Sequence, residues 1–168
     1  MEKRFGRRAQ QIMGMSFGVI FSIILIVFIL VTGIIVVKYF LDFQKCGQVK
    51  IFVDDFNEGV DRVWKSDSLE FNFEGRLPSG LEYVCFFNSS RSVRGNWDDV
   101  GNEINVFDRE NLFFYPLEKS CDNPAHRVQH LNLGSITRTD NPYCIPVRSG
   151  RVVIGIEKGM NEGLVGVR

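Results

Sequence analysis

The stretch from residue 15 to residue 37 is predominantly hydrophobic, and it contains no charged residue. At the rise of an α-helix, its 23 residues reach about 35 Å, enough to cross a hydrocarbon core of about 30 Å. A helix satisfies its own backbone hydrogen bonds, so it is the structure that such a segment adopts in lipid. The pattern predicts a transmembrane helix over 15–37. A helix buried in a soluble core is the disfavoured alternative, because a domain of this size rarely hides a helix that is apolar on every side.

After the apolar run the pattern changes to helical spacing. Apolar residues recur at alternating intervals of three and four, which places them on one stripe of a helix. The stripe consists of Cys46, Val49, Val53, Phe56, Val60 and Val63. No proline precedes Pro78, so we expect the helix to continue to about residue 65. Two partners are open for the stripe: a second helix in a coiled coil, or the chain's own sheet, which its width and aromatic character favour.

Short apolar runs separated by polar turns follow the helix and predict an antiparallel sheet. We expect strands at 69–73, 81–87, 104–107, 112–115, 144–147 and 151–156, with weaker candidates at 128–133 and 164–167. The third and fourth strands should form one hairpin, and the fifth and sixth another. Strand 81–87 is apolar on nearly every position and should be central, whereas Pro146 makes strand 144–147 an edge strand. The predicted fold class is α+β: an N-terminal transmembrane helix that continues as a long amphipathic helix packed on an antiparallel β-sheet.

Charge sets the orientation of this plan. Four basic residues and one acidic residue precede the apolar run, so the positive-inside rule places the N-terminus in the cytoplasm. We therefore divide the chain into a cytoplasmic basic leader (1–14), the transmembrane helix (15–37), an amphipathic extension (38–65) and an extracytoplasmic β domain (66–168). The apolar run is longer than that of a secretory signal, and no small-x-small cleavage site follows it. We expect a single-pass protein that stays in the cell membrane.

All four cysteines follow the apolar run. An even number on the outer side of a membrane predicts two disulfides, although four buried free thiols are the alternative. Three pairings are open. Asp-Asn-Pro segments beside Cys121 and Cys144 favour a bridge between these two, which leaves Cys46 to tie the helix to Cys85 in the sheet.

The remaining composition points away from catalysis. The 20 basic and 20 acidic residues balance, so we expect the lipid bilayer and not nucleic acid as a partner. His126 and His130 lie near Cys121 in sequence, but their spacing matches no zinc site, and we interpret both as solvated loop histidines. Asp98 and Asp99 lack the spacing of a calcium loop. No nucleophile, phosphate-binding or metalloprotease motif is present. We predict no enzymatic activity, no cofactor and no metal.

One triplet, Asn88-Ser89-Ser90, has the sequence of an N-glycosylation acceptor. It falls in a polar loop on the side of the chain that we expect outside the cell. Whether it is used depends on whether the host glycosylates proteins.

The plan of basic leader, hydrophobic helix, amphipathic helix and sheet resembles the type IV pilin family, including its archaeal pilin-like members and the pseudopilins. Arg7-Arg8-Ala9-Gln10 is similar to the basic–small–Gln processing site of archaeal prepilins. The resemblance implies cleavage between Ala9 and Gln10 and packing of like subunits through the transmembrane helix.

Two functional hypotheses follow from this plan. The first is a membrane-anchored extracytoplasmic structural or interaction protein: a pilin-like subunit or minor component of a surface filament or secretion assembly. The alternative is a stand-alone single-pass membrane protein whose outer domain binds an unknown ligand.

Overall fold

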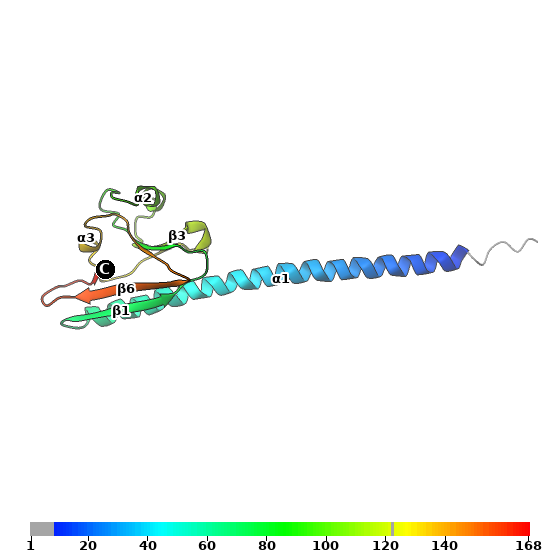
Figure 1. Ribbon diagram of the computed structural model, residues 1–168, viewed down its shortest axis with the longest axis horizontal. Coiled ribbons are helices and arrows are strands. Elements are labelled where there is room, and N and C mark those ends of the chain that lie inside the picture. The colour runs from blue at the N-terminus through cyan, green and yellow to red at the C-terminus, as the bar shows by residue number, and fades with distance from the viewer. Residues whose placement is uncertain (1–8, 122) are drawn as a thin grey trace, which may run out of the picture. The chain divides into compact units, whose positions relative to one another are not determined.

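The computed structural model describes residues 9–121 and 123–168, with side chains described from residue 18 onward. Most of the predicted leader, residues 1–8, therefore lies outside the described residues. Helix α1 spans Ala9–Trp64 (Figure 1), which confirms one long helix that ends near residue 65. The chain divides into two compact units, residues 1–42 and 43–168, and each is described separately below.

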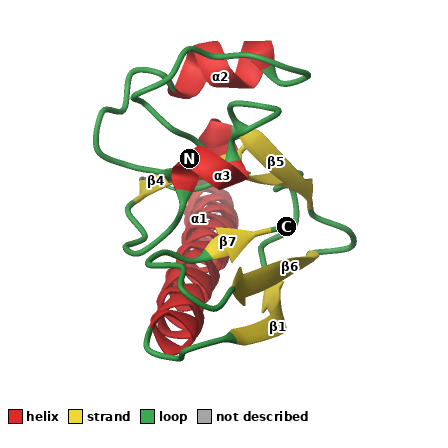
Figure 2. Cartoon of the chain, turned by 90° about the vertical axis from the view of Figure 1, so that its left-hand side faces the viewer, coloured by secondary structure: helices red, strands yellow, loops and turns green. Residues whose placement is uncertain are grey.

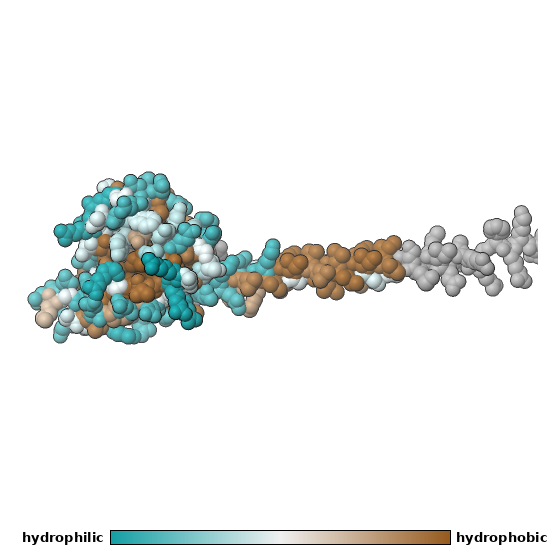
Figure 3. All heavy atoms as spheres, in the orientation of Figure 1, coloured by the Kyte–Doolittle hydropathy of each residue, from teal (hydrophilic) through white to brown (hydrophobic). Residues whose placement is uncertain are grey.

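The described part of the first unit is a helix with an exposed apolar surface. Every residue from Gly18 to Asp42 is solvent-exposed, and Figure 3 shows the hydrophobic side chains gathered along this stretch. Nothing else within the described unit packs on these side chains. A helix of this composition needs a partner other than water, because exposed apolar surface of this extent is unfavourable.

The second unit contains two antiparallel sheets (Figure 2) and confirms the α+β fold class. The first sheet has the order β1-β6-β7, formed by β1 (Leu69–Arg76), β6 (Arg151–Lys158) and β7 (Gly166–Val167). The second has the order β4-β3-β2-β5, formed by β4 (Ala125–His126), β3 (Leu112–Tyr115), β2 (Tyr83–Phe86) and β5 (Tyr143–Pro146). Strand β2 lies inside its sheet and β5 at its edge, as the sequence predicts.

Three short helical turns lie between the strands: α2 (Asp98–Ile104), η1 (Leu117–Lys119) and α3 (Leu133–Ile136). The expected hairpin of 104–107 with 112–115 is wrong, because Ile104 ends α2. Val100 and Ile104 are both buried, and their spacing of four places them on one helical face. Gly101 packs so closely on Val93 that no Cβ would fit.

The second expected hairpin, 144–147 with 151–156, is also wrong. Both strands exist, but β5 pairs with β2 and β6 pairs with β1, so the chain changes sheets between them. Between these two segments there is one isolated antiparallel bridge, from Arg148 to Arg151. The expected strand at 128–133 is absent as well: Leu131 makes one isolated bridge to Val165.

The amphipathic half of α1 packs on both sheets. Five of the six stripe residues are buried and join one core with both sheets, and Cys46 is half-buried; the five are Val49, Val53, Phe56, Val60 and Val63. The ring of Phe56 lies 5.3 Å from that of Phe73 on β1 and 5.8 Å from that of Phe86 on β2. Figure 1 shows β1 and β6 alongside these turns of the helix. Of the two partners left open, the helix stripe contacts the chain's own sheets.

Gly75 on β1 is one position where this packing requires glycine. A Cβ there would collide with the ring of Phe52, which is also buried against the sheet. The helix therefore approaches the sheet closely at this residue.

Candidate functional site

The first candidate site is the apolar surface of α1 itself. Among the described residues, one helix is long and apolar enough to cross a membrane, and it is this one. The hydroxyl groups of Ser22 and Thr32 in its apolar run donate hydrogen bonds to the carbonyls of Gly18 and Phe28. These hydroxyls are thus satisfied within the helix and require no water.

The second feature is a pair of disulfides. Cys46 bonds to Cys121, and Cys85 bonds to Cys144, so the expected pairing of Cys46 with Cys85 and Cys121 with Cys144 is wrong. The correction has a geometric reason. Cys85 on β2 and Cys144 on β5 are direct partners in the strand register, with Cα atoms 4.0 Å apart. Sequence alone does not show that β5 pairs with β2.

The two disulfides differ in burial. Cys85 and Cys144, on strands of the second sheet, are buried in the smaller of two core clusters among the described residues. Cys46 and Cys121 are half-buried, and their bond ties the helix to the segment that links η1 to β4. One candidate membrane helix near the N-terminus and two disulfides together fit a membrane-anchored protein with an oxidised domain.

A cleft of about 400 Å³ lies beside the Cys46–Cys121 bond. One wall is α1, with Lys50 and Asp54 one turn apart, and the other is the segment from η1 to β4. The lining residues are Cys46, Val49, Lys50, Val53, Asp54, Ser120, Cys121, Asn123 and His126. The volume is that of a small-molecule site, and the lining carries both charge signs.

His126 in this wall is a titratable group whose pKa the fold shifts. Burial lowers its pKa from the ordinary value of 6.5, against the opposing effects of a hydrogen bond to the Asn123 backbone and of the Asp54 charge. Its Nε2 atom is buried and has no hydrogen-bond partner within the described residues. The folded protein therefore favours the neutral imidazole. The interpretation of His126 as a solvated loop residue is wrong, because β4 pairing with β3 carries it into the fold.

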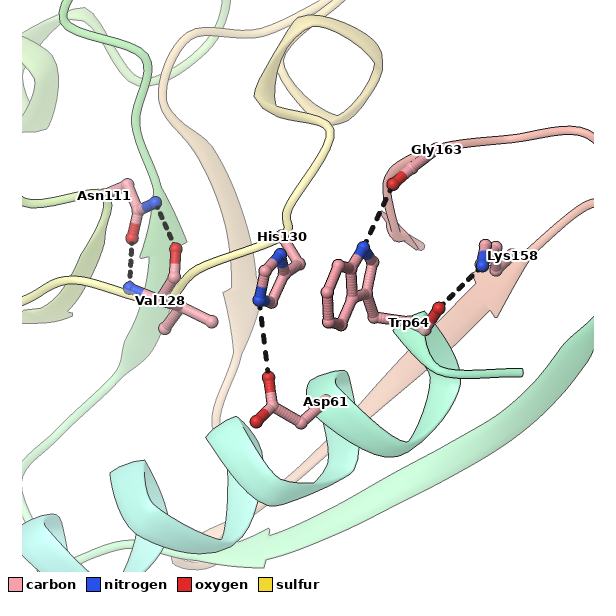
Figure 4. Close-up of polar contacts among 7 residues, drawn as sticks. All are labelled: Asp61, Trp64, Asn111, Val128, His130, Lys158 and Gly163. Carbon is pink, nitrogen blue, oxygen red and sulfur yellow. Dashed lines mark hydrogen bonds and ion pairs between the residues drawn. The ribbon is translucent and has the colours of Figure 1, made fainter. Parts of the chain in front are cut away.

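His130 lies in a loop, as expected, but its side chain is not solvated, because it is only 26% exposed. Its ring stacks on the indole of Trp64, with ring centroids 3.7 Å apart, and its Nε2 lies 3.8 Å from the Asp61 carboxylate (Figure 4). The indole Nε1 donates a hydrogen bond to the carbonyl of Gly163, and Lys158 donates to the carbonyl of Trp64. The last turn of α1 thus contacts His130, Lys158 and Gly163, which are all distant from it in sequence.

Figure 4 also shows how the chain that leads to His130 is fixed. The buried Asn111 side chain donates to the carbonyl of Val128 and accepts from its N–H, both at 2.8 Å. This pair of bonds replaces strand pairing beyond the end of β4.

The predicted processing residues Ala9 and Gln10 lie at the start of α1, and their side chains are outside the described residues, as are Arg7 and Arg8. In the described ranges, no group of three or more His, Cys, Asp and Glu side chains is placed to hold a metal. Asp98 and Asp99 form the first turn of α2.

Comparison with models of protein families, with curated proteins and with solved structures gives no match. Fold and site define the class: an α+β protein with one candidate membrane helix near its N-terminus, among the described residues, and a disulfide-bonded domain. The particular role is a proposal.

Proposed function

We propose that this protein is a structural subunit of a surface assembly, held in the cell membrane with its domain outside: a pilin-like subunit or minor component of a filament or secretion system. The proposal gives it a structural and not a catalytic role. One observation carries it. Helix α1 is exposed over residues 18–42 and carries no charged residue from 18 to 37, whereas its apolar stripe from Val49 to Val63 is buried in the chain's own domain.

A filament subunit needs one helix that both anchors its own domain and offers an apolar surface to other copies. In the C-terminal half of α1, from residue 43 to residue 64, the apolar stripe is covered by both sheets. This half has no other exposed apolar face of comparable size. The N-terminal half, described from residue 18 to residue 42, has no partner in the described structure. It can be covered by lipid or by the same half of another copy. In lipid, close packing between such helices rests on small residues, and Gly18 and Gly33 each have open space at the Cβ position.

The oxidised state of the domain supports the outer location. All four cysteines form disulfides, and such bonds persist on the outer side of a cell membrane. The basic leader supports the same orientation by an independent argument, because positive charge is retained on the cytoplasmic side.

Processing by a prepilin peptidase tests the proposal most directly. The full chain is produced with and without the peptidase, extracted from membranes, and its N-terminus is measured by mass spectrometry. We expect cleavage between Ala9 and Gln10. The variant Ala9→Trp should abolish cleavage because it removes the small residue, and the matched Ala9→Gly should retain it. An intact N-terminus in the presence of an active peptidase contradicts the proposal.

A crosslinking experiment tests the second part of the proposal, that like subunits associate through α1. Cysteine introduced by Gly33→Cys lies in the apolar run, where no side chain is within 4 Å of the new Cβ. Oxidative crosslinking in membranes should then give a covalent dimer if like helices pack together. The control is Lys65→Cys, which places a thiol on the exposed surface beyond the end of α1.

A second candidate function is a stand-alone single-pass protein with an outer binding domain. The cleft beside Cys46–Cys121 is the observation that favours it, since it has the size and mixed lining of a ligand site. An uncut N-terminus together with a monomeric chain in membranes would select this candidate over the filament subunit.

A further inference from the structure

The loop after β2 carries a short polar triplet near the surface. Asn88-Ser89-Ser90 is the acceptor triplet of the sequence, and it begins two residues beyond the end of β2. Ser89 and Ser90 are exposed and Asn88 is half-exposed. An N-glycan is attached outside the cytoplasm, so this inference rests on the outer orientation of the proposed function.

The hydrogen bonds of Asn88 leave its amide nitrogen available. The side-chain Oδ1 accepts a bond of 3.0 Å from the backbone N–H of Ser90, which forms a local turn around the triplet. This bond occupies the oxygen of the amide, and it therefore distinguishes Oδ1 from Nδ2. The nitrogen, Nδ2, has no partner among the described residues and is the atom that glycosylation requires.

The backbone of Asn88 is fixed independently of its side chain. The buried Asn141 side chain accepts from the Asn88 N–H at 3.0 Å and donates to the Asn88 carbonyl at 3.1 Å. The N–H of Arg91 also donates to this carbonyl and closes the turn. The fold thus holds the main chain on the inside and leaves the side chain of Asn88 at the surface, where an attached sugar displaces no core residue.

We propose that Asn88 is the acceptor of an N-linked glycan. The amide nitrogen forms a bond to the anomeric carbon of a lipid-linked oligosaccharide. The bond from that carbon to the lipid phosphate oxygen breaks, the lipid phosphate leaves with the electron pair, and the amide gives up one proton. No electron transfer is involved. The acceptor triplet requires a hydroxyl-bearing residue at its third position, and Ser90 supplies it.

The test is translation of the full chain with microsomes that contain an oligosaccharyltransferase and lipid-linked oligosaccharide. Glycan addition is read as a mass increase that endoglycosidase removes. Ser90→Ala removes the acceptor hydroxyl and keeps the backbone N–H that bonds to Asn88, and Ser90→Thr keeps both. We expect one glycan on the wild type and on Ser90→Thr, and none on Ser90→Ala.

A further variant separates failure of this inference from failure of the proposed orientation. Glu74→Thr turns Asn72-Phe73-Glu74 into an acceptor triplet, and both Asn72 and Glu74 are exposed on β1. With Asn88 in use, this variant should carry two glycans. One glycan on Glu74→Thr and none on the wild type would overturn the assignment of Asn88 and keep the domain outside. No glycan on either would reject the outer orientation, and the Asn88 assignment with it.

Discussion

The imidazole of His130 lies parallel to the indole of Trp64, at an angle of 10° and a centroid distance of 3.7 Å. His130 adopts this position with a backbone φ of 65°, in the left-handed region that most residues avoid. The contact joins the last turn of α1 to the chain that precedes α3, and it closes the same end of the domain as the Trp64–Gly163 hydrogen bond.

This stack leads to a prediction for two variants of His130. His130→Asn removes the ring but tolerates a positive φ, so it should lower the free energy of unfolding by about 0.5–1.5 kcal/mol. His130→Ala also loses the ring and resists the left-handed conformation, at a further cost of about 1–2 kcal/mol. Urea unfolding of the full chain in detergent, followed by tryptophan fluorescence, measures both. Wild-type stability of His130→Asn would show that the stack contributes nothing.

The stripe on α1 predicts a large effect at Phe56. Its side chain is fully buried between the two sheets, so Phe56→Ala should cost about 3–5 kcal/mol, a large part of a small domain's stability. Ile51 lies on the same helix and is 62% exposed, so Ile51→Ala is the matched control with an expected change within about 0.5 kcal/mol. Thermal unfolding at two protein concentrations checks the result. A loss for Phe56→Ala that depends on concentration would indicate contacts between copies.

The different burial of the two disulfides predicts an order of reduction. A mild dithiol reductant should open Cys46–Cys121 first, because both residues are half-buried, and should reach Cys85–Cys144 only when the domain unfolds. Alkylation and peptide mapping along a reductant series gives the order. Replacing Cys46 and Cys121 by serine should cost about 2–4 kcal/mol, because the bond closes a long loop in the unfolded chain. Simultaneous reduction of both bonds would contradict this prediction.

The pKa of His126 predicts a pH dependence of stability. Burial holds this pKa below 6.5 in the folded protein, so the unfolded chain binds the proton more readily. As the pH falls below about 6.5, the free energy of unfolding should therefore decrease, until the pH reaches the lower pKa of the folded state. His126→Gln does not titrate and should lack this contribution. The measurement is the difference in unfolding free energy between wild type and variant from pH 7.5 to pH 5.5, and a constant difference would refute the prediction.

The sequence by itself determined the features that depend on local periodicity. The apolar run and the stripe from Val49 to Val63 define α1, because helical spacing is visible over each few residues. The positions of β1, β2, β3, β5 and β6 follow in the same way from short apolar segments between turns. The central place of β2 and the edge place of β5 were also readable, from apolar residues on both faces in one and from Pro146 in the other.

Only the tertiary structure decided which of these segments meet. Local pattern favoured a hairpin of β5 with β6, but β5 pairs with β2 and β6 pairs with β1, so each joins a strand that is distant from it in the chain. Both sheets pack on the stripe of α1. That arrangement places Cys85 opposite Cys144, where they form one disulfide, and Cys46 forms the other with Cys121. It also brings His130 onto Trp64, a contact between residues 66 positions apart that no spacing in the sequence could indicate. Such contacts depend on how the whole chain fills its core, and this is a property of the packed fold and not of any single segment.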